Sequence, residues 1–217
     1  MPKLSDCYLY GILDLAYIGP AKARAATEAM IRGGVDLIQL RGKEASIDEL
    51  TDLAGELHSI TAEKSIPLIV NDHPEIACRV PVEGVHVGQD DQSVASVRAQ
   101  VGRPILVGKS THSVGQAIAA RREGADYIGF GPLYPTPTKP AYAAIGLTDI
   151  ERVHHEVNIP IFCIGGIKLQ NLPEVIAAGA QRVVIVSGLL QADDITDYAR
   201  SCKNLLKRTS EPTPQPI

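Results

Sequence analysis

Two aspartates stand where apolar runs give way to polar residues, and their chemistry suits a metal ion. Asp72 ends the run PLIVND (67–72), and Asp91 follows the run GVHVG (84–88). Carboxylate oxygens are the ligands that Mg²⁺ prefers, and Mg²⁺ commonly keeps several waters and is completed by substrate phosphates. An Asn-Asp pair such as Asn71-Asp72 is also a common turn former, so this pair alone leaves both interpretations open.

Three cationic side chains could bind the phosphate oxygens that such a metal ion would accompany. Arg41 and Lys43 stand at and just beyond the end of the run DLIQLR (36–41), and Lys139 follows the run YIGFG (127–131). The planar fork of a guanidinium matches phosphate oxygens, and an ammonium acts as a point charge. These residues predict a binding site for an anionic substrate.

Lys139 belongs to a proline-rich segment, GFGPLYPTPTKPAYAAIG (129–146), which also carries Thr136 and Thr138. A stiff surface turn is the simpler interpretation of that segment. The alternative is an anion-binding loop, because prolines restrict the backbone before any ligand arrives and so reduce the entropy lost on binding.

Glycine-containing turns late in the chain indicate a second place for an anion. Gly165-Gly166 and Val186-Ser187-Gly188 each follow an apolar run. Such turns present backbone N–H groups, although a Gly-Gly pair alone is weak support for a ligand site. Together with the carboxylates and cations, these turns predict two anion sites in one mouth, for two phosphorylated substrates or one bisphosphate.

The elements that must position these residues are short apolar runs alternating with helical patterns. The predicted strands occupy residues 9–14, 36–41, 67–72, 84–88, 105–110, 127–131, 159–166 and 182–188. The clearest predicted helices occupy residues 21–34, 46–60, 113–125 and 169–180. This alternation indicates a single (β/α)8 TIM barrel over residues 1–208, with an open doubly wound sheet as the alternative. In a TIM barrel the chemistry lies at the carboxyl ends of the strands, where the polar residues above fall. Residues 209–217 are expected to be a disordered tail.

Composition excludes several classes of partner. A formal net charge of −4 argues against a nucleic-acid-binding protein. The four cysteines form no C-x-x-C pair, so neither a zinc site nor a thioredoxin-like motif is indicated. The start of the chain is no signal peptide, and no apolar run approaches membrane-spanning length. We therefore expect a cytoplasmic protein with small-molecule partners and no membrane contact; the oligomeric state stays open, a homo-oligomer included.

The motifs, taken together and in order, resemble the thiamine phosphate synthase family from about Tyr8 to the last helix. They are Gln39-x-Arg41-x-Lys43, Asn71-Asp72, His86-x-Gly88-Gln89-x-Asp91, Ser110-x-His112, Pro135-Thr136-x-Thr138-Lys139, Gly165-Gly166-Ile167 and Val186-Ser187. Any one of them alone would be a weak signal, whereas the ordered series is specific.

The resemblance implies a Mg²⁺-dependent transferase. The family joins hydroxymethylpyrimidine diphosphate to hydroxyethylthiazole phosphate, and pyrophosphate leaves before the thiazole nitrogen captures the pyrimidine methylene cation. The implied Mg²⁺ ligands are Asp72 and Asp91, and the implied catalytic residues are Ser110, Lys139 and Arg41. The implied pyrimidine diphosphate site comprises Gln39, Arg41, Lys43, Asn71, Ser110 and Lys139, and the implied thiazole phosphate site comprises Thr136, Thr138, Gly166, Val186 and Ser187.

Three residues depart from the family pattern. Leu13 and Gly42 replace a threonine and an acidic residue near the expected mouth, and Lys109 replaces a small apolar residue. The run VGKSTHS (107–113) leans toward the related thiazole tautomerases, whose active-site histidine matches His112.

A tautomerase is accordingly the alternative function. It needs neither a metal nor a diphosphate site, and it would be expected to lack Asp72, Asp91, Thr138 and Lys139, all of which this chain keeps. A catalytically silent phosphate-ligand binder on the same barrel is a further alternative, against which the complete set of cations and carboxylates argues.

Overall fold

Eight parallel strands close into a barrel, with β1 paired to both β2 and β8. The computed structural model describes residues 3–136 and 143–208, and the predicted tail, 209–217, lies outside them. The strands are β1 (Leu9–Asp14), β2 (Leu37–Arg41), β3 (Leu68–Asn71), β4 (Gly84–Val87), β5 (Leu106–Thr111), β6 (Tyr127–Phe130), β7 (Ile161–Cys163) and β8 (Val183–Ile185). The predicted TIM barrel is confirmed.

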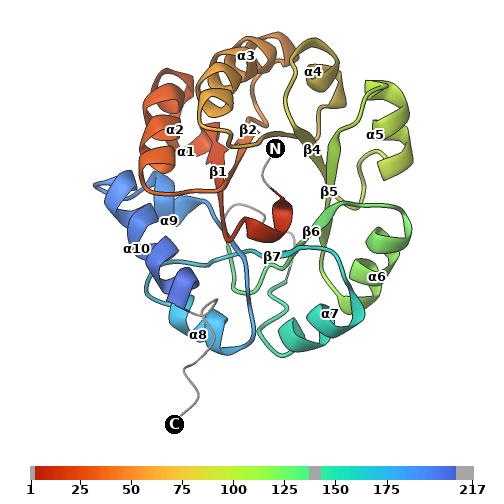
Figure 1. Ribbon diagram of the computed structural model, residues 1–217, viewed down its shortest axis with the longest axis vertical. Coiled ribbons are helices and arrows are strands. Elements are labelled where there is room, and N and C mark those ends of the chain that lie inside the picture. The colour runs from red at the N-terminus through yellow and green to blue at the C-terminus, as the bar shows by residue number, and fades with distance from the viewer. Residues whose placement is uncertain (1–2, 137–142, 209–217) are drawn as a thin grey trace.

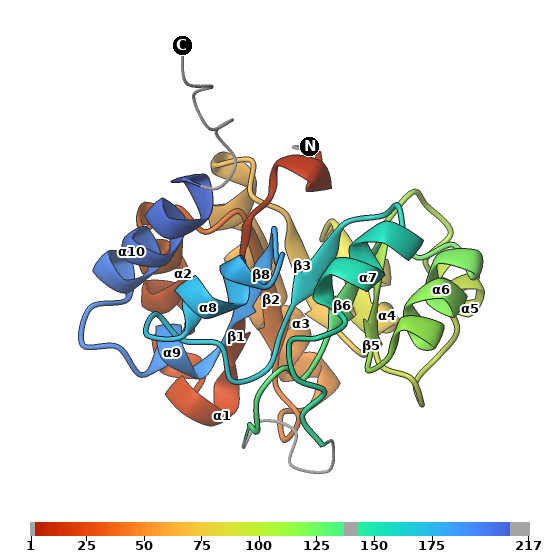
Figure 2. The same ribbon diagram turned by 90° about the horizontal axis from the view of Figure 1, so that it is seen from below.

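Helices surround the strands on the outside of the barrel (Figure 1). They are α1 (Leu15–Ile18), α2 (Ala23–Arg32), α3 (Ile47–Glu63), α4 (Pro74–Arg79), α5 (Val94–Val101), α6 (Val114–Arg122), α7 (Ile150–Glu156), α8 (Leu172–Ala177), α9 (Ser187–Leu190) and α10 (Ile195–Arg208), with 3-10 turns at Leu4–Asp6 and Pro20–Lys22. Figure 2 shows the turn Leu4–Asp6 and helix α1 at opposite ends of the barrel, so α1 marks the face formed by the carboxyl ends of the strands.

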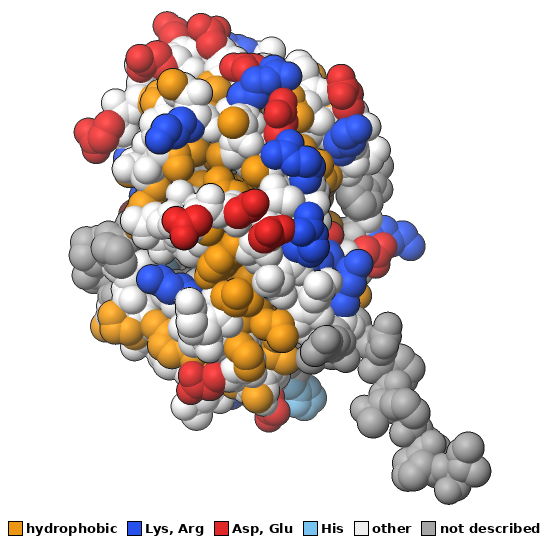
Figure 3. Space-filling view, turned by 90° about the vertical axis from the view of Figure 1, so that its left-hand side faces the viewer, with side chains coloured by type: hydrophobic (Ala, Val, Ile, Leu, Met, Phe, Trp, Pro, Cys, Tyr) orange, Lys and Arg blue, Asp and Glu red, His pale blue; other side chains and the backbone are white. Residues whose placement is uncertain are grey.

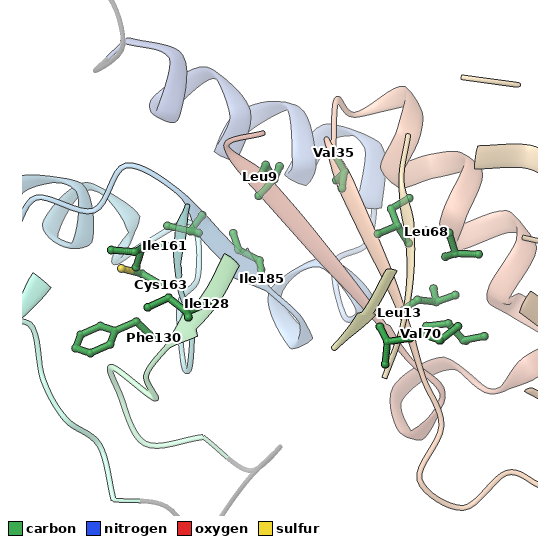
Figure 4. Close-up of a cluster of buried hydrophobic side chains, with 14 of the residues drawn as sticks. Leu9, Leu13, Val35, Leu68, Val70, Ile128, Phe130, Ile161, Cys163 and Ile185 are labelled. Atoms are coloured by element: carbon green, nitrogen blue, oxygen red, sulfur yellow. The ribbon is translucent and has the colours of Figure 1, made fainter. Parts of the chain in front are cut away.

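Apolar side chains form one layer on each face of the strand wall. The outer layer packs between strands and helices and includes Leu13, Val70 and Phe130 (Figure 4). The inner layer fills the barrel and includes Tyr10, Tyr127, Phe162, Leu37 and Ile69. Because successive side chains of a strand point to opposite faces, burial on both faces explains the nearly continuous apolar runs in the sequence.

Two aspartates fix strand starts at the end of the barrel away from α1. Asp36 Oδ2 accepts hydrogen bonds from the backbone N–H groups of Tyr8 at 2.8 Å and Leu9 at 2.9 Å. Asp126 Oδ2 accepts one from Val107 N at 2.6 Å. Each carboxylate satisfies a backbone donor at the beginning of the preceding strand, so these residues serve the fold rather than the mouth.

Some element boundaries differ from those predicted. The capping box at Ser46 and Glu49 is present, with Glu49 N donating to Ser46 Oγ at 3.3 Å and Ser46 N donating to Glu49 Oε2 at 2.9 Å. By contrast, the strand predicted over 159–166 ends at Cys163. Gly165 and Gly166 have φ values of +99° and +67°, which turn the chain out of the strand.

Candidate active site

The carboxyl ends of the strands surround a hollow that opens to solvent. Most of the predicted site residues line it: Gln39, Arg41, Asn71, Ser110, Thr136, Gly166, Val186 and Ser187. The fold thus brings residues from both halves of the sequence into one space.

Lys43, Asp72 and Asp91 are absent from the lining and follow the ends of β2, β3 and β4. Thr138 and Lys139 lie outside the described residues.

Asp72 already binds a cation of the chain itself. Its carboxylate, whose side chain is 14% exposed, accepts a hydrogen bond from the Lys43 ammonium. Its backbone has a φ of +62°, uncommon for a residue with a Cβ, and its N–H donates to the His86 carbonyl at 2.8 Å. This attachment fixes the carboxylate beside the end of β4, and its pairing with an ammonium fits a site that takes cations.

Asp91 is exposed and is oriented by its own loop. Its Oδ2 accepts a hydrogen bond from the backbone N–H of Gly88 at 2.7 Å. Within residues 3–136 and 143–208, no group of three or more His, Cys, Asp or Glu residues is arranged to hold a metal ion. A metal ion at these carboxylates would have to take its other ligands from water and substrate, as Mg²⁺ commonly does.

Arg41 is the buried cation of the site. Its guanidinium pairs with Asp14, and the two side chains are 11% and 1% exposed. Asp14 Oδ1 also accepts a hydrogen bond from Ala16 N at 3.1 Å, at the start of α1. The Nε of Arg41 is buried and has no hydrogen-bond partner in the described structure. An arginine held on one side with a donor left over is suited to bind an anionic ligand.

His86 points into the barrel, a direction that the sequence leaves open. Its Nε2 lies 3.0 Å from Ser110 Oγ, and its Nδ1 lies 3.2 Å from the Tyr127 hydroxyl. Neither Tyr127 nor Tyr10, which also lies in the barrel, is among the predicted site residues. Register could have pointed to His86, because His86 pairs with Asn71 and paired residues of parallel strands face the same side.

The loops after β6 and β7 are joined by backbone hydrogen bonds. Leu133 N donates to Ile164 O at 2.8 Å, and Tyr134 N donates to Gly165 O at 3.1 Å. A Cβ added at Gly166 would lie 2.6 Å from the Cβ of Tyr134, so glycine is required for this approach. The contact holds the described start of the proline-rich segment, through Thr136, against the glycine turn.

His112 lies in the same hollow. Its Nδ1 is 2.5 Å from the Gly131 carbonyl, and its backbone N–H donates to Gln116 Oε1 at 2.7 Å. A ring that donates at Nδ1 keeps Nε2 as its acceptor nitrogen. His112 therefore belongs to the lining of the hollow.

None of the three departures from the family pattern lines the hollow within the described residues. Leu13 belongs to the outer apolar layer, and Gly42 is packed so that an added Cβ would lie 2.8 Å from Leu15 Cδ1 and 2.9 Å from Leu50 Cδ2. Lys109 pairs with Glu123 at 2.5 Å beside α6. The three residues therefore contribute no side chain to the described lining of the hollow.

The surface over α2, α9 and α10 has mixed charge. Figure 3 shows Lys and Arg side chains interspersed with Asp and Glu on this face.

Among the described residues, no helix combines the length and apolar character needed to cross a membrane.

The sequence and the structure of this protein are similar to those of known proteins. The family described as "Thiamine monophosphate synthase" matches residues 9–189. The thiamine-phosphate synthase of Chloroflexus aurantiacus is 42% identical over 207 residues, covering 95% of each chain. That of Halalkalibacterium halodurans is 38% identical over 206 residues, covering 94% of this chain and 98% of the relative.

A solved structure agrees with these relatives. The thiamine phosphate pyrophosphorylase of Pyrococcus furiosus superposes with a TM-score of 0.86 at 26% identity, covering 95% of this chain and 98% of the other. Both the sequence and the barrel thus match along almost their full length. The chain belongs to the thiamine monophosphate synthase family.

Proposed function

We propose that this chain joins hydroxymethylpyrimidine diphosphate to hydroxyethylthiazole phosphate, forming thiamine phosphate and releasing pyrophosphate. Membership of the family supports the reaction. The observation that carries the proposal is that one hollow has Arg41 and Asn71 on the side of β2 and β3, and Gly166 and Ser187 after β7 and β8. Two anionic groups can therefore be held in the same space.

The pyrimidine diphosphate occupies the side of β2 to β5 in this proposal. Arg41, fixed by Asp14, and Lys43 neutralise its phosphate oxygens, and Gln39 and Asn71 contact the substrate as hydrogen-bonding groups. Lys139 serves the same diphosphate from the proline-rich segment. Cations that are already oriented stabilise negative charge as it grows on the departing pyrophosphate, without a reorganisation cost at that moment.

Asp72 and Asp91 would hold Mg²⁺. Bound there, the ion supplies positive charge that stabilises the leaving diphosphate. The Asp72 carboxylate also accepts a hydrogen bond from the Lys43 ammonium. A cation held at Asp72 would compete with Lys43 for this carboxylate.

The thiazole phosphate occupies the glycine turns. Ser187 begins α9, and the first N–H groups of a helix have no partner within it, so they are available to phosphate oxygens. Gly166, Thr136, Thr138 and Val186 complete this side. Ser110 lies between the two sides on β5, close to the centre at which the new carbon–nitrogen bond forms.

The tautomerase alternative has one specific observation in its favour. His112 lines the hollow, and its Nδ1 is held by the Gly131 carbonyl, so Nε2 is the nitrogen that could accept a proton from a thiazole ligand. A tautomerase would leave Arg41, Lys43 and the two aspartates without a role.

Pyrophosphate release by the purified protein tests these alternatives. With both substrates present, we expect release that requires Mg²⁺ and is matched by thiamine phosphate formation. Arg41→Gln should abolish both while leaving circular dichroism unchanged, and Arg152→Gln, an exposed arginine on α7, serves as the matched control. Isomerisation of a thiazole carboxylate phosphate without pyrophosphate release would instead favour the tautomerase. Binding of both substrates without either reaction would favour a silent binder.

A cytoplasmic location completes the proposal. Cys7, Cys78, Cys163 and Cys202 are all free thiols, as is usual for proteins of a reducing compartment.

A further inference from the structure

Five polar side chains form a continuous hydrogen-bonded chain across the inside of the barrel. Gln39 Nε2 donates to the Tyr10 hydroxyl at 2.5 Å, which lies 3.2 Å from the Tyr127 hydroxyl. The Tyr127 hydroxyl lies 3.2 Å from His86 Nδ1, and His86 Nε2 lies 3.0 Å from Ser110 Oγ. The chain therefore links a residue on β2 to one on β5 through β1, β6 and β4.

The barrel is built to accommodate this chain. Gln39 and Tyr10 are 1% exposed, Tyr127 is fully buried and His86 is 8% exposed. Burying so many polar groups is costly unless each has a partner, and the links of the chain supply them. A Cβ at Gly108 would collide with the Tyr127 ring and would lie 2.5 Å from His86 Nδ1. Gly108 thus makes room for the central link.

The first donor gives the chain a direction. Because the Gln39 amide donates to the Tyr10 oxygen, the single hydroxyl hydrogen of Tyr10 is available to Tyr127, and that of Tyr127 to His86 Nδ1. Burial raises the pKa of both phenols, so each keeps its hydrogen at neutral pH. An imidazole that accepts at Nδ1 carries its hydrogen on Nε2 and donates it to Ser110 Oγ.

We propose that Tyr10, Tyr127 and His86 are positioning residues that hold Ser110 as a hydrogen-bond donor toward the hollow. Since Ser110 Oγ receives its hydrogen bond from His86, its own hydrogen is left for a ligand. On the proposed function, on which this step rests, the acceptor belongs to the pyrimidine diphosphate. The sequence motifs assign a role to Ser110 but none to Tyr10 or Tyr127.

The tautomer of His86 tests the direction of the chain independently of activity. We would record two-bond nitrogen–proton correlation spectra of protein with ¹⁵N-labelled histidine rings and assign His86 from the spectrum of His86→Asn. The expected result is the form protonated at Nε2. A ring protonated at Nδ1 would overturn the proposal, because Ser110 would then donate to His86 and not to the ligand.

Variants of the tyrosines test whether the chain sets this tautomer. In Tyr127→Phe the preference for the Nε2 form should be lost. Tyr10→Phe should weaken the same preference, and it is the variant to measure if Tyr127→Phe fails to fold. Tyr8→Phe makes the same chemical change at the residue just before β1, where the ring contacts Lys203, and should leave the spectrum unchanged. A His86 tautomer unaffected by both Tyr127→Phe and Tyr10→Phe would mean that the chain does not control it.

Kinetics then test the consequence for Ser110. Tyr127→Phe should lower kcat by roughly tenfold with little change in KM. The reason is that the hydrogen bond donated by Ser110 to the pyrimidine diphosphate should strengthen as negative charge grows on the departing pyrophosphate. The double variant Y127F/S110A should be no slower than S110A, since both changes remove one interaction. If the losses in kcat of the two single variants multiply in the double variant, Tyr127 does not act through Ser110. The tautomer measurement stands even if the protein catalyses a different reaction.

Discussion

At the scale of single residues, the position of the Arg41 guanidinium depends on its ion pair with Asp14. Both side chains are almost completely buried, and their pair stands at the end of adjacent strands β1 and β2. Removing one partner of a buried pair leaves the other charge without compensation, which costs more than the loss of an exposed pair. Asp14 therefore compensates the charge of Arg41 and holds its guanidinium at the hollow.

Asp14→Asn should destabilise the fold and slow the reaction together. Asparagine retains an Oδ1 acceptor for Ala16 N and removes the charge that faces Arg41. We expect a loss of about 1–3 kcal/mol in the free energy of unfolding, measured with urea. We also expect a loss in kcat/KM of roughly tenfold to a hundredfold, since a small displacement of a catalytic group is costly.

Asp48→Asn is the matched control. Asp48 pairs with Arg79 on the surface, where the two side chains are 87% and 55% exposed. Its loss should change stability by less than about 0.5 kcal/mol. Equal effects of the two substitutions would show that burial of the Arg41 pair has no energetic consequence.

Lys43 and a metal ion should compete for Asp72. Lys43→Met removes the ammonium that binds the carboxylate, so Mg²⁺ should bind the substrate-free protein about two- to fivefold more tightly, measured by isothermal titration calorimetry. Turnover should fall, because the diphosphate loses a cation. Lys64→Met, at the exposed end of α3, should change neither quantity. Unchanged or weaker Mg²⁺ binding in Lys43→Met would contradict this competition.

Sequence could predict which residues end the strands, but not how they contact one another. Gln39, Arg41 and Ser110 are predictable because polar residues at the ends of apolar runs contrast with the runs. Tyr10 and Tyr127 give no such contrast, since tyrosine is common in strands and both lie among apolar residues. Their roles depend on the closed barrel, which brings their hydroxyls to 3.2 Å although they are 117 positions apart in the sequence.

At the scale of elements, the last helix, α10, packs on α2 outside the barrel. The contact is close at Gly33, where an added Cβ would collide with Ala199 and would lie 2.7 Å from the Thr196 carbonyl oxygen. Lys203 on the same helix pairs with Asp36 at the base of β2. The last helix is thus attached to the first elements of the chain by packing and by charge.

Gly33→Ala should separate α10 from α2. Because the neighbouring atoms are backbone and a short side chain, they cannot rotate away, and we expect a loss of about 1–3 kcal/mol in unfolding free energy. Gly55→Ala, in the interior of α3, has open space around the added Cβ and should stabilise the protein by about 0.5–1 kcal/mol. If both substitutions stabilise the fold, the packing of α10 against Gly33 is looser than described.

Element boundaries were predictable where local chemistry marks them. Ser46 and Glu49 mark the start of α3 through side-chain hydrogen bonds that act within one turn. The end of β7 carried a partial signal: the Gly165-Gly166 pair indicated a turn, but its packing against Pro132 and Tyr134 from another loop was not predictable. A contact between segments distant in sequence leaves no local pattern.

At the scale of the whole molecule, the two ends of the barrel have different tasks. The end that carries α1 holds the hollow, whereas the opposite end holds carboxylates that fix strand starts. Asp36 and Asp126 serve the beginnings of β1 and β5, and Glu83 Oε2 accepts from Leu68 N at 2.8 Å at the start of β3. Stability can therefore be altered at this end without altering the site.

At the end of the barrel opposite α1, His154 should make the stability of the fold depend on pH. This residue lies in the last turn of α7, and burial, followed by the nearby Arg182, lowers its pKa from the usual 6.5. Its Nε2 is buried without a hydrogen-bond partner in the described structure. As pH falls below about 6.5, His154 takes up a proton in the unfolded chain but not in the folded one, so the free energy of unfolding decreases.

His154→Leu should flatten this dependence. Urea unfolding between about pH 7.5 and about pH 5.5 should show a smaller decrease in stability for the variant than for the wild type. The difference is bounded at about 1.4 kcal/mol per pH unit, since one proton is involved. His155→Leu is the matched control, because His155 is the exposed next residue of the same turn. A wild-type pH dependence retained in His154→Leu would show that His154 titrates alike in both states, and kcat should be the same in both variants because neither histidine lines the hollow.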